Sequence, residues 1–140
     1  MAKRIFIIGG PNTGKSSLAQ EFAARHGIKD VLNTDALIGL GWSEASAEAA
    51  KFIDEKGGGD FVLEGCATAR ALRKWMTNNP GKPLPEGSQV YMLNLPYLPQ
   101  TKNQQTMTKG MLTVMTEIYG ELVARGATFE QPEKSEGDHV

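Results

Sequence analysis

The sequence has few of the residues that build disulfides or metal centres. Its 140 residues include a single cysteine, Cys66, which excludes an internal disulfide, and two histidines, His26 and His139. The histidines lie far apart and have no cysteine partners at metal-ligand spacing, so a zinc site is not expected. No apolar run approaches the roughly 20 residues that a membrane helix requires. We therefore expect no membrane partner.

We also expect no signal peptide, because Met1-Ala2-Lys3-Arg4 leads directly into the apolar run of an expected strand. The hydrophobic share of 40% and the charged share of 22% are ordinary for a globular protein. We expect one domain over residues 1–131, a polar and flexible tail over 132–140, and a cytoplasmic protein, in the host cytoplasm if it is viral.

The most informative feature is the segment GGPNTGKS at residues 9–16, which fits the pattern G-x-x-x-x-G-K-[ST] at every fixed position. The apolar run at 5–8 predicts a buried strand before it, and Leu18 and Phe22 predict a helix face after it. The glycines let successive N–H groups surround an anion, next to the positive end of the helix. The segment predicts a nucleoside triphosphate site formed by Gly10, Pro11, Asn12, Thr13, Gly14, Lys15, Ser16 and Ser17.

Two residues of this segment carry specific chemistry. Lys15 can reach the β- and γ-phosphates, and the Ser16 hydroxyl can ligate Mg²⁺. We expect ATP and Mg²⁺ as the cofactors and no metal other than Mg²⁺. No base-reading motif selects ATP over GTP.

The chain alternates strand and helix signals, which predicts an α/β fold with a parallel sheet of four or five strands and helices on both faces. Ser43 is the expected N-cap of the second helix. The polar stretch 96–109 has no strong periodicity and is expected as a loop, followed by a helix whose stripe begins at Met111. Strands are expected at 3–8, 30–34, 61–63, 90–95 and 127–130, and helices at 15–25, 43–53, 68–77 and 111–125.

Three charged residues are expected at the carboxyl ends of the strands, where ligands of such sheets bind. Two lie at the end of an expected strand, and the third lies a few residues after the turn that follows the strand at 61–63. Asp35 is the candidate carboxylate that deprotonates an acceptor hydroxyl, and its alternative role is to cap the turn after Thr34. Glu64 either holds Mg²⁺, contacts the substrate, or accepts backbone N–H bonds in its own turn. Arg70 is expected to clamp phosphate.

The central part of the chain is basic although the net charge is −1. Residues 65–116 carry six basic side chains against Glu86 alone, whereas residues 117–140 carry two against six acidic ones. Lys102 and Lys109 flank the polar stretch and either close on the triphosphate as a lid or are solvated. Of the aromatic residues in this block, Tyr97 is a better candidate than Trp75 or the strand residue Tyr91 for stacking on a base.

The segment GGPNTGKSS, the strand ending NTD at 33–35 and the strand ending LEG at 63–65 followed by Arg70 resemble the nucleotide-kinase-like P-loop phosphotransferases. This group includes adenylate-kinase-like enzymes, zeta-toxin-like kinases and polynucleotide 5′-kinases, and the resemblance covers residues 3–125. The compact size is most similar to the short phage-encoded kinases that phosphorylate 5-hydroxymethyluracil in DNA. The resemblance implies a single P-loop NTPase-type domain with strand order 2-3-1-4-5, Lys15 and Ser16 at the triphosphate and Mg²⁺, Asp35 as the acceptor base and Arg70 at phosphate, so that Lys15, Asp35 and Arg70 are the expected catalytic residues. From their places in the chain we also expect Lys109 at the triphosphate and Glu64 with Ser16 at Mg²⁺.

The sequence departs from the family pattern in two places. The stretch 96–109 offers lysines where a kinase lid usually carries arginines, and the strand at 61–63 lacks the usual Walker B aspartate. Three hypotheses remain open. An open cleft beside the basic block favours a kinase acting on a hydroxyl of a nucleic acid or nucleotide; the alternatives are a small-metabolite kinase and a nucleotide-dependent switch. Against the switch, the chain has neither Asp-x-x-Gly after the third strand nor Asn-Lys-x-Asp.

Overall fold

The computed structural model describes residues 3–11, 13–93 and 99–130. Five strands form one parallel sheet in the order β2-β3-β1-β4-β5, which confirms the expected α/β fold and strand order. The strands are β1 (Arg4–Gly9), β2 (Val31–Asn33), β3 (Phe61–Gly65), β4 (Ser88–Leu93) and β5 (Thr128–Glu130). The helices are α1 (Lys15–His26), the 3₁₀ helix η1 (Thr34–Leu40), α2 (Trp42–Lys56), α3 (Thr68–Asn78) and α4 (Lys102–Ala124).

Strand β1 lies at the centre of the sheet and pairs with β3 on one side and β4 on the other. Strands β2 and β5 complete the sheet outside them. Because every pairing is parallel, all five strands end at one edge of the sheet, here called the carboxyl edge, and begin at the opposite, amino edge. The loop after β1 and the turns after β2 and β3 therefore meet at the carboxyl edge.

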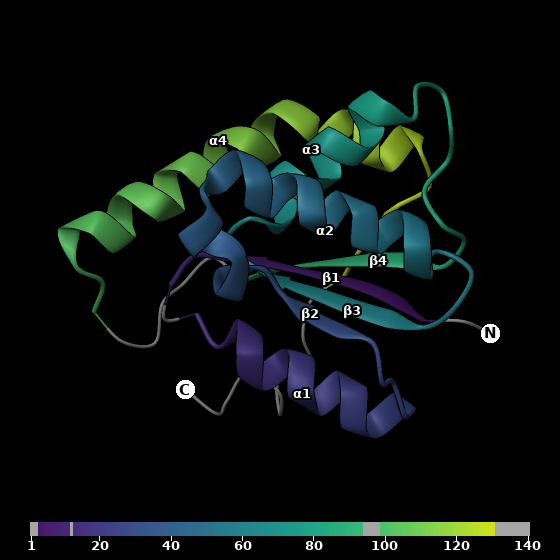
Figure 1. The fold of residues 1–140 in the computed structure, drawn as a ribbon, viewed down its shortest axis with the longest axis horizontal. Coiled ribbons are helices and arrows are strands. Elements are labelled where there is room, and N and C mark those ends of the chain that lie inside the picture. The colour runs from purple at the N-terminus through teal and green to yellow at the C-terminus, as the bar shows by residue number, and fades with distance from the viewer. Residues whose placement is uncertain (1–2, 12, 94–98, 131–140) are drawn as a thin grey trace.

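The sheet is covered on both faces, by α1 on one side and by α2, α3 and α4 on the other (Figure 1). The alternation along β1 explains this arrangement, since successive side chains of a strand point to opposite faces. Ile5 and Ile7 pack with Leu18 and Phe22 of α1, whereas Phe6 joins the larger core under the other three helices. Burying each such side chain contributes about 1.5–3 kcal/mol.

Helix α1 ends where the sequence predicts, because Gly27 takes a left-handed conformation with φ 63°. The predicted N-cap of α2 is wrong by two residues. Its N-cap is Gly41 with no side-chain cap, and Ser43 lies inside the helix. Strand β4 covers 88–93; the expected strand residues 94 and 95, like the expected tail at 132–140, lie outside the described residues.

The largest correction concerns the polar stretch, since α4 begins at Lys102 and not after 109. Thr101 starts it with a capping box, in which its hydroxyl accepts from the Gln104 N–H and the Gln104 side chain accepts from the Thr101 N–H. The first turns of α4 extend beyond the body of the domain (Figure 1). They therefore bury no continuous apolar stripe, which is why periodicity could not reveal them. Within the described ranges, no helix is long and apolar enough to cross a membrane.

Candidate functional site

The loop between β1 and α1 has the geometry of an anion site. Thr13 is buried and its hydroxyl donates to the Gly10 carbonyl at 2.8 Å, which closes the loop. Gly14 takes a left-handed conformation with φ 82°, and no side chain caps the start of α1. The helix N-terminus thus presents uncapped backbone N–H groups and a partial positive charge to the loop, which suits a phosphate. Asn12, an expected contact, lies outside the described residues.

Lys15 and Asp35, both expected site residues, meet at the carboxyl edge. The Lys15 ammonium lies 3.1 Å from Asp35 Oδ2, and the two side chains are 8% and 35% exposed. The ammonium also donates to the Gly10 carbonyl at 3.3 Å. The other Asp35 oxygen accepts the Cys66 N–H at 2.8 Å. Asp35 is therefore held in place from the phosphate loop and from the turn after β3.

The alternative role considered for Asp35, capping the turn after Thr34, is carried out by Asn33. The Asn33 side chain caps η1 by accepting the Asp35 N–H at 2.8 Å. Thr34 is fully buried, and its hydroxyl accepts the Ala67 N–H at 3.1 Å. Gly65 has φ 128°, and a Cβ there would lie 2.1 Å from the Thr34 hydroxyl. Thr34 thus joins the ends of β2 and β3, a role that the sequence analysis missed.

Ser16 and Glu64, the two expected Mg²⁺ residues, also come together. The Ser16 hydroxyl donates to both Glu64 oxygens at 3.2 and 3.4 Å. Burial raises the pKa of Glu64, whereas the Ser16 hydrogen bond and the charge of Lys15 lower it. A hydroxyl and a carboxylate side by side are oxygen ligands of the kind that Mg²⁺ takes together with substrate phosphates. Among the described residues, no group of three His, Cys, Asp or Glu side chains forms a metal site by itself.

Arg70 lies beside this cluster and not within it. Its guanidinium stacks over Trp42 at 4.6 Å from the ring centre, and Nη1 is buried without a hydrogen-bond partner in the described part of the chain. Burial lowers the Arg70 pKa, and the nearby Arg73 lowers it further. A Cβ at Gly110 of α4 would lie 2.9 Å from the other Arg70 nitrogen, so glycine makes room for the side chain. The partner Trp42 was not anticipated from the sequence.

The start of α4 contacts the phosphate loop through residues that the sequence analysis missed. Gln100 donates to the Pro11 carbonyl at 2.5 Å. Thr108 packs on the loop, since a Cβ at Gly10 would lie 2.1 Å from its hydroxyl. Lys102 and Lys109, the expected lid residues, are exposed and lie in this helix, so the expectation of a loop at their positions is wrong.

The remaining candidates separate into core and undescribed residues. Trp75 is buried and donates to Asp54 at 2.7 Å, and Tyr91 packs against Phe22. Tyr97 lies outside the described residues. Cys66 is buried, and burial raises the pKa of its thiol to about 12. The thiol is therefore protonated at neutral pH.

Comparisons with known proteins show which solved structures share the fold of this chain. No family model matches the sequence, and no curated protein matches it. Among solved structures, the shikimate kinase of Acinetobacter baumannii in complex with shikimate has a TM-score of 0.54 and 15% identity, over 99% of this chain and 89% of that one. A gluconokinase of Sinorhizobium meliloti 1021 has a TM-score of 0.52 and 14% identity, over 94% and 83%.

A second shikimate kinase, from Bacteroides thetaiotaomicron, has a TM-score of 0.50 and 10% identity, over 98% of this chain and 92% of that one. At such identities the likeness concerns the fold alone. The strand order, the phosphate loop after β1 and the helices on both faces agree with it. The chain is therefore a single α/β domain with the fold of the P-loop kinases.

Proposed function

We propose that the protein is an ATP-dependent kinase that transfers the γ-phosphoryl group to a hydroxyl of a nucleic acid or nucleotide. The observation that carries the phosphotransferase assignment is the Lys15–Asp35 contact of 3.1 Å beside an uncapped helix N-terminus. It joins a cation that can bind phosphate to a carboxylate that can accept a proton. Phosphoryl transfer needs little more than these groups held in place.

In this proposal the Asp35 carboxylate takes the proton of the acceptor hydroxyl. The oxygen of that hydroxyl forms a bond to the γ-phosphorus, and the bond between the γ-phosphorus and the leaving ADP oxygen breaks. Lys15 and the N–H groups of the loop hold the phosphates. Ser16 and Glu64 would hold Mg²⁺, which neutralises charge on the phosphate oxygens. Arg70 and Lys109 are proposed to contact phosphate from the α3 and α4 sides.

The choice of acceptor rests on charge. Residues 65–116 carry five more basic than acidic side chains, and an anionic acceptor matches this excess. Compact size supports the choice less well than the sequence alone implied. The shikimate kinase that contains shikimate is matched over 89% of its length, so a chain of similar size accommodates a small acceptor. A small-metabolite kinase is accordingly the second candidate, favoured by this likeness.

The specific acceptor that we propose is the hydroxymethyl group of 5-hydroxymethyluracil in phage DNA, on the family resemblance of the phosphate loop and strand ends. The test is a transfer assay with γ-labelled ATP and Mg²⁺. The acceptors are duplex DNA with 5-hydroxymethyluracil, matched thymine DNA, DNA with 5′-hydroxyl ends, free nucleosides, and small polyols including shikimate and gluconate.

Label on the hydroxymethyl DNA alone would establish a base-directed DNA kinase, and label at 5′ ends an end kinase. Label on a polyol alone would replace the nucleic acid by a metabolite. Hydrolysis of ATP without label on any acceptor would favour a nucleotide-dependent switch and contradict the kinase proposal. Asp35→Asn is the control in every arm, because it retains the loop and removes the proposed base.

A further inference from the structure

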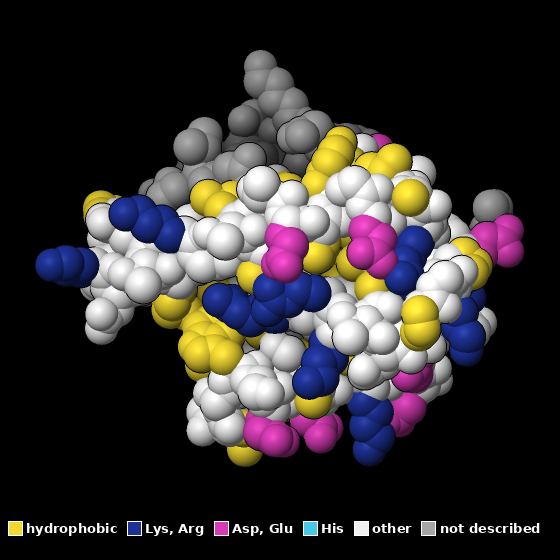
Figure 2. Space-filling view, turned by 90° about the horizontal axis from the view of Figure 1, so that it is seen from above, with side chains coloured by type: hydrophobic (Ala, Val, Ile, Leu, Met, Phe, Trp, Pro, Cys, Tyr) yellow, Lys and Arg dark blue, Asp and Glu magenta, His cyan; other side chains and the backbone are white. Residues whose placement is uncertain are grey.

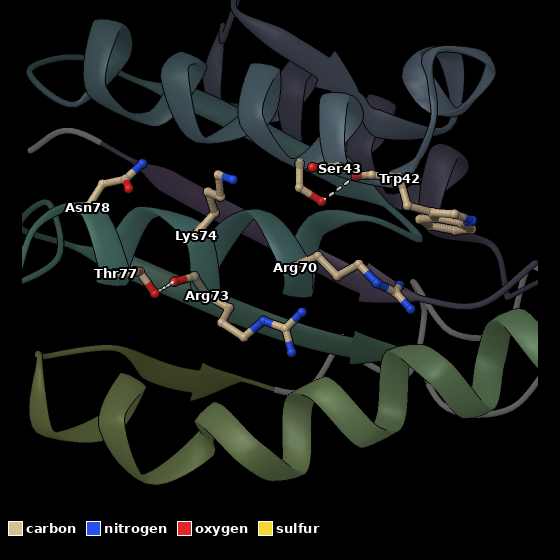
Figure 3. A pocket seen from close by; sticks show the side chains of 8 residues that line it. Trp42, Ser43, Arg70, Arg73, Lys74, Thr77 and Asn78 are labelled. Atoms are coloured by element: carbon tan, nitrogen blue, oxygen red, sulfur yellow. Dashed lines mark hydrogen bonds between the residues drawn. The ribbon is translucent and has the colours of Figure 1, made fainter.

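A groove lies between α2 and α3 on the face of the domain opposite α1. It encloses about 400 Å³. Figure 3 shows its lining side chains, with Trp42 and Arg70 at one end and Asn78 at the other. Both helices begin at the carboxyl edge, so the Trp42 end is the end near the phosphate loop. This α2–α3 groove is lined by Trp42, Ser43, Ser46, Arg70, Arg73, Lys74, Thr77 and Asn78.

The α2–α3 groove is positively charged. Its lining includes three cations from α3 and no carboxylate. Figure 2 shows Lys and Arg side chains gathered in the middle of this face of the molecule, with Asp and Glu side chains beside them. Arg73 is paired with Glu117 of α4 at 2.8 Å. Within the described residues, Arg70 and Lys74 have no carboxylate partner, so the groove retains an uncompensated positive charge.

A neighbouring cavity differs from the α2–α3 groove in its charge. The cavity on the other side of Arg73, between α3 and α4, encloses about 350 Å³ and is lined by Glu117 and Glu121 as well as Arg73. The two cavities share Arg73 of α3, and one of them is lined by carboxylates while the other is not. An anionic chain is repelled from the first and attracted to the α2–α3 groove.

The Arg70 end carries the strongest sign of a missing anionic partner. Arg70 Nη1 is buried and unpaired in the described part of the chain, and leaving a desolvated guanidinium nitrogen without an acceptor is unfavourable. The guanidinium lies over the Trp42 ring, 4.6 Å from the ring centre, and this cation–π contact helps to hold it at this end of the groove. One turn earlier, Cys66 donates its N–H to Asp35. The groove therefore opens next to the proposed catalytic carboxylate.

The spacing of the cations suits a polymer. Arg70, Arg73 and Lys74 stand at positions i, i+3 and i+4, so they are neighbours on the surface of α3 over a rise of about 6 Å. In a duplex each strand carries a phosphate about every 3.4 Å of the helix axis, and the phosphates of an extended single strand lie farther apart, so these cations can contact neighbouring phosphates. Figure 3 shows Lys74 directed toward α2 and Arg73 toward α4, with hydroxyl and amide groups farther along. Such groups bind phosphate and sugar without reading sequence.

We propose that the α2–α3 groove binds a single strand of nucleic acid, with phosphates on Arg70, Arg73 and Lys74 and a base against Trp42. The proposal rests on the proposed function for the reaction to which the strand is delivered. An open, extended groove with an aromatic side chain at one end and cations along its length is the arrangement that binds single strands irrespective of sequence. A small neutral acceptor has no use for this row of charges.

The test measures binding without ATP, by fluorescence anisotropy of labelled oligothymidylate between about 50 and 200 mM salt. The groove variant is Arg73→Gln with Lys74→Gln. The matched control is Lys51→Gln with Lys56→Gln, which removes the same charge from α2 residues paired with Glu55 and Asp30. We expect the groove variant to bind about tenfold more weakly and its slope of log affinity against log salt to fall by about 1.4, which is 0.7 for each phosphate contact of a single strand.

The control should retain its affinity within about twofold and its full slope. Bound strand should also quench Trp42 fluorescence, and Trp42→Phe should remove that quenching while the buried Trp75 remains. Equal losses in the control and the groove variant would overturn the proposal. So would absence of binding to the wild type, binding of polyglutamate as tight as that of the strand, or binding of dTMP as tight as that of the strand.

The same variants separate this proposal from the proposed function. Strand binding that needs Arg73 and Lys74, without transfer of label to any acceptor, would support the groove and contradict the kinase. Transfer of label to single-stranded DNA with 5-hydroxymethyluracil that is unchanged in the groove variant at low substrate concentration would support the kinase and contradict the groove.

Discussion

Two aspartate–lysine pairs flank the short strand β2, one at each edge of the sheet. At the amino edge, Asp30 lies 3.4 Å from Lys56, and both side chains are well exposed. At the carboxyl edge, Asp35 lies 3.1 Å from Lys15, whose side chain is 8% exposed. An exposed pair is worth about 0–1 kcal/mol to stability. The second pair is instead tied to the phosphate loop and to the turn after β3, so its value lies in positioning chemical groups.

The same contrast holds for the arginines. Near the amino edge, Arg125 donates to the carbonyls of Asn79, Lys82 and Met76. Near the carboxyl edge, Arg70 has a buried nitrogen without a partner in the described residues. The three helices α1, α2 and α3 that begin there have no side-chain cap. The Arg125 guanidinium is thus satisfied within the protein, whereas the Arg70 guanidinium and the starts of these three helices are open to a ligand, although η1 and α4 have side-chain caps.

Lys15→Ala should have the largest effect on activity of the variants that test this contrast. We expect both triphosphate binding and phosphoryl transfer to fall by at least about 10²–10³-fold, the effect of removing one preorganised donor at a transition-state charge. The fold should persist, because Asp35 remains partly solvated, with a thermal midpoint within about 4 °C of wild type. Nucleotide binding by calorimetry and the transfer assay measure the two effects. Lys51→Ala is the control, and transfer at wild-type rate by Lys15→Ala would refute the site.

Asp35→Asn separates transfer from binding. Asparagine retains an oxygen that accepts the Cys66 N–H and loses the proton acceptor, so transfer should fall by about 10²–10⁴-fold. Affinity for ATP should change little. The control is Asp30→Asn at the other end of β2, which should leave both quantities unchanged. If the two variants have equal activity, the assignment of Asp35 as the base is wrong.

Arg125→Ala tests the satisfied edge. Its side chain is 12% exposed and bridges the end of α3 to the following turn. Losing hydrogen bonds from a buried charge should lower the free energy of unfolding by about 2–3 kcal/mol. Transfer by the remaining folded protein should be unchanged. Urea unfolding measures the loss, and Arg125→Lys should restore only part of it because lysine lacks the planar fork. Lost transfer in folded Arg125→Ala would contradict the separation of the edges.

Sequence reasoning predicted the parts of this site that local patterns encode. The spacing of residues 9–16 identifies the phosphate loop, and the alternation of apolar runs gives the strand whose end is Glu64, with Asp35 just after β2. It missed residues whose role depends on long-range packing. Thr34 joins two strand ends, and the loop is contacted by Gln100, just before α4, and by Thr108 within α4. No periodicity marks such contacts, because they are made by single side chains between segments far apart in sequence.

The start of α4 shows the same limit for secondary structure. Lys102 to Lys109 carry no apolar stripe because this end of the helix extends beyond the core, so the capping residues Thr101 and Gln104 were the available signal. Trp42 illustrates the limit for the site, since its stacking with Arg70 joins two helices. A pattern within one helix cannot show it.

Glu64→Gln should give the smallest effect, and it should raise the stability of the fold where Arg125→Ala lowers it. Burial raises the Glu64 pKa above its ordinary value of 4.5, so the folded state holds the proton more tightly than the unfolded state. Its contribution to stability is present below pH 4.5 and is lost as the pH rises through the raised pKa. The neutral glutamine avoids this loss and still accepts from Ser16. Without metal, the variant should therefore be more stable than wild type at pH 7.5 and no more stable at pH 4.

Thermal unfolding at the two pH values measures this difference, with the exposed Glu55→Gln as a control that should show none. Adding Mg²⁺ and nucleotide should stabilise the wild type more than Glu64→Gln, because the variant has lost a carboxylate ligand. A variant that is equally destabilised at both pH values would show that Glu64 serves the turn after β3. A gain in stability confined to neutral pH, with a loss of Mg²⁺ response, would show that the carboxyl edge gives up stability for its ligand.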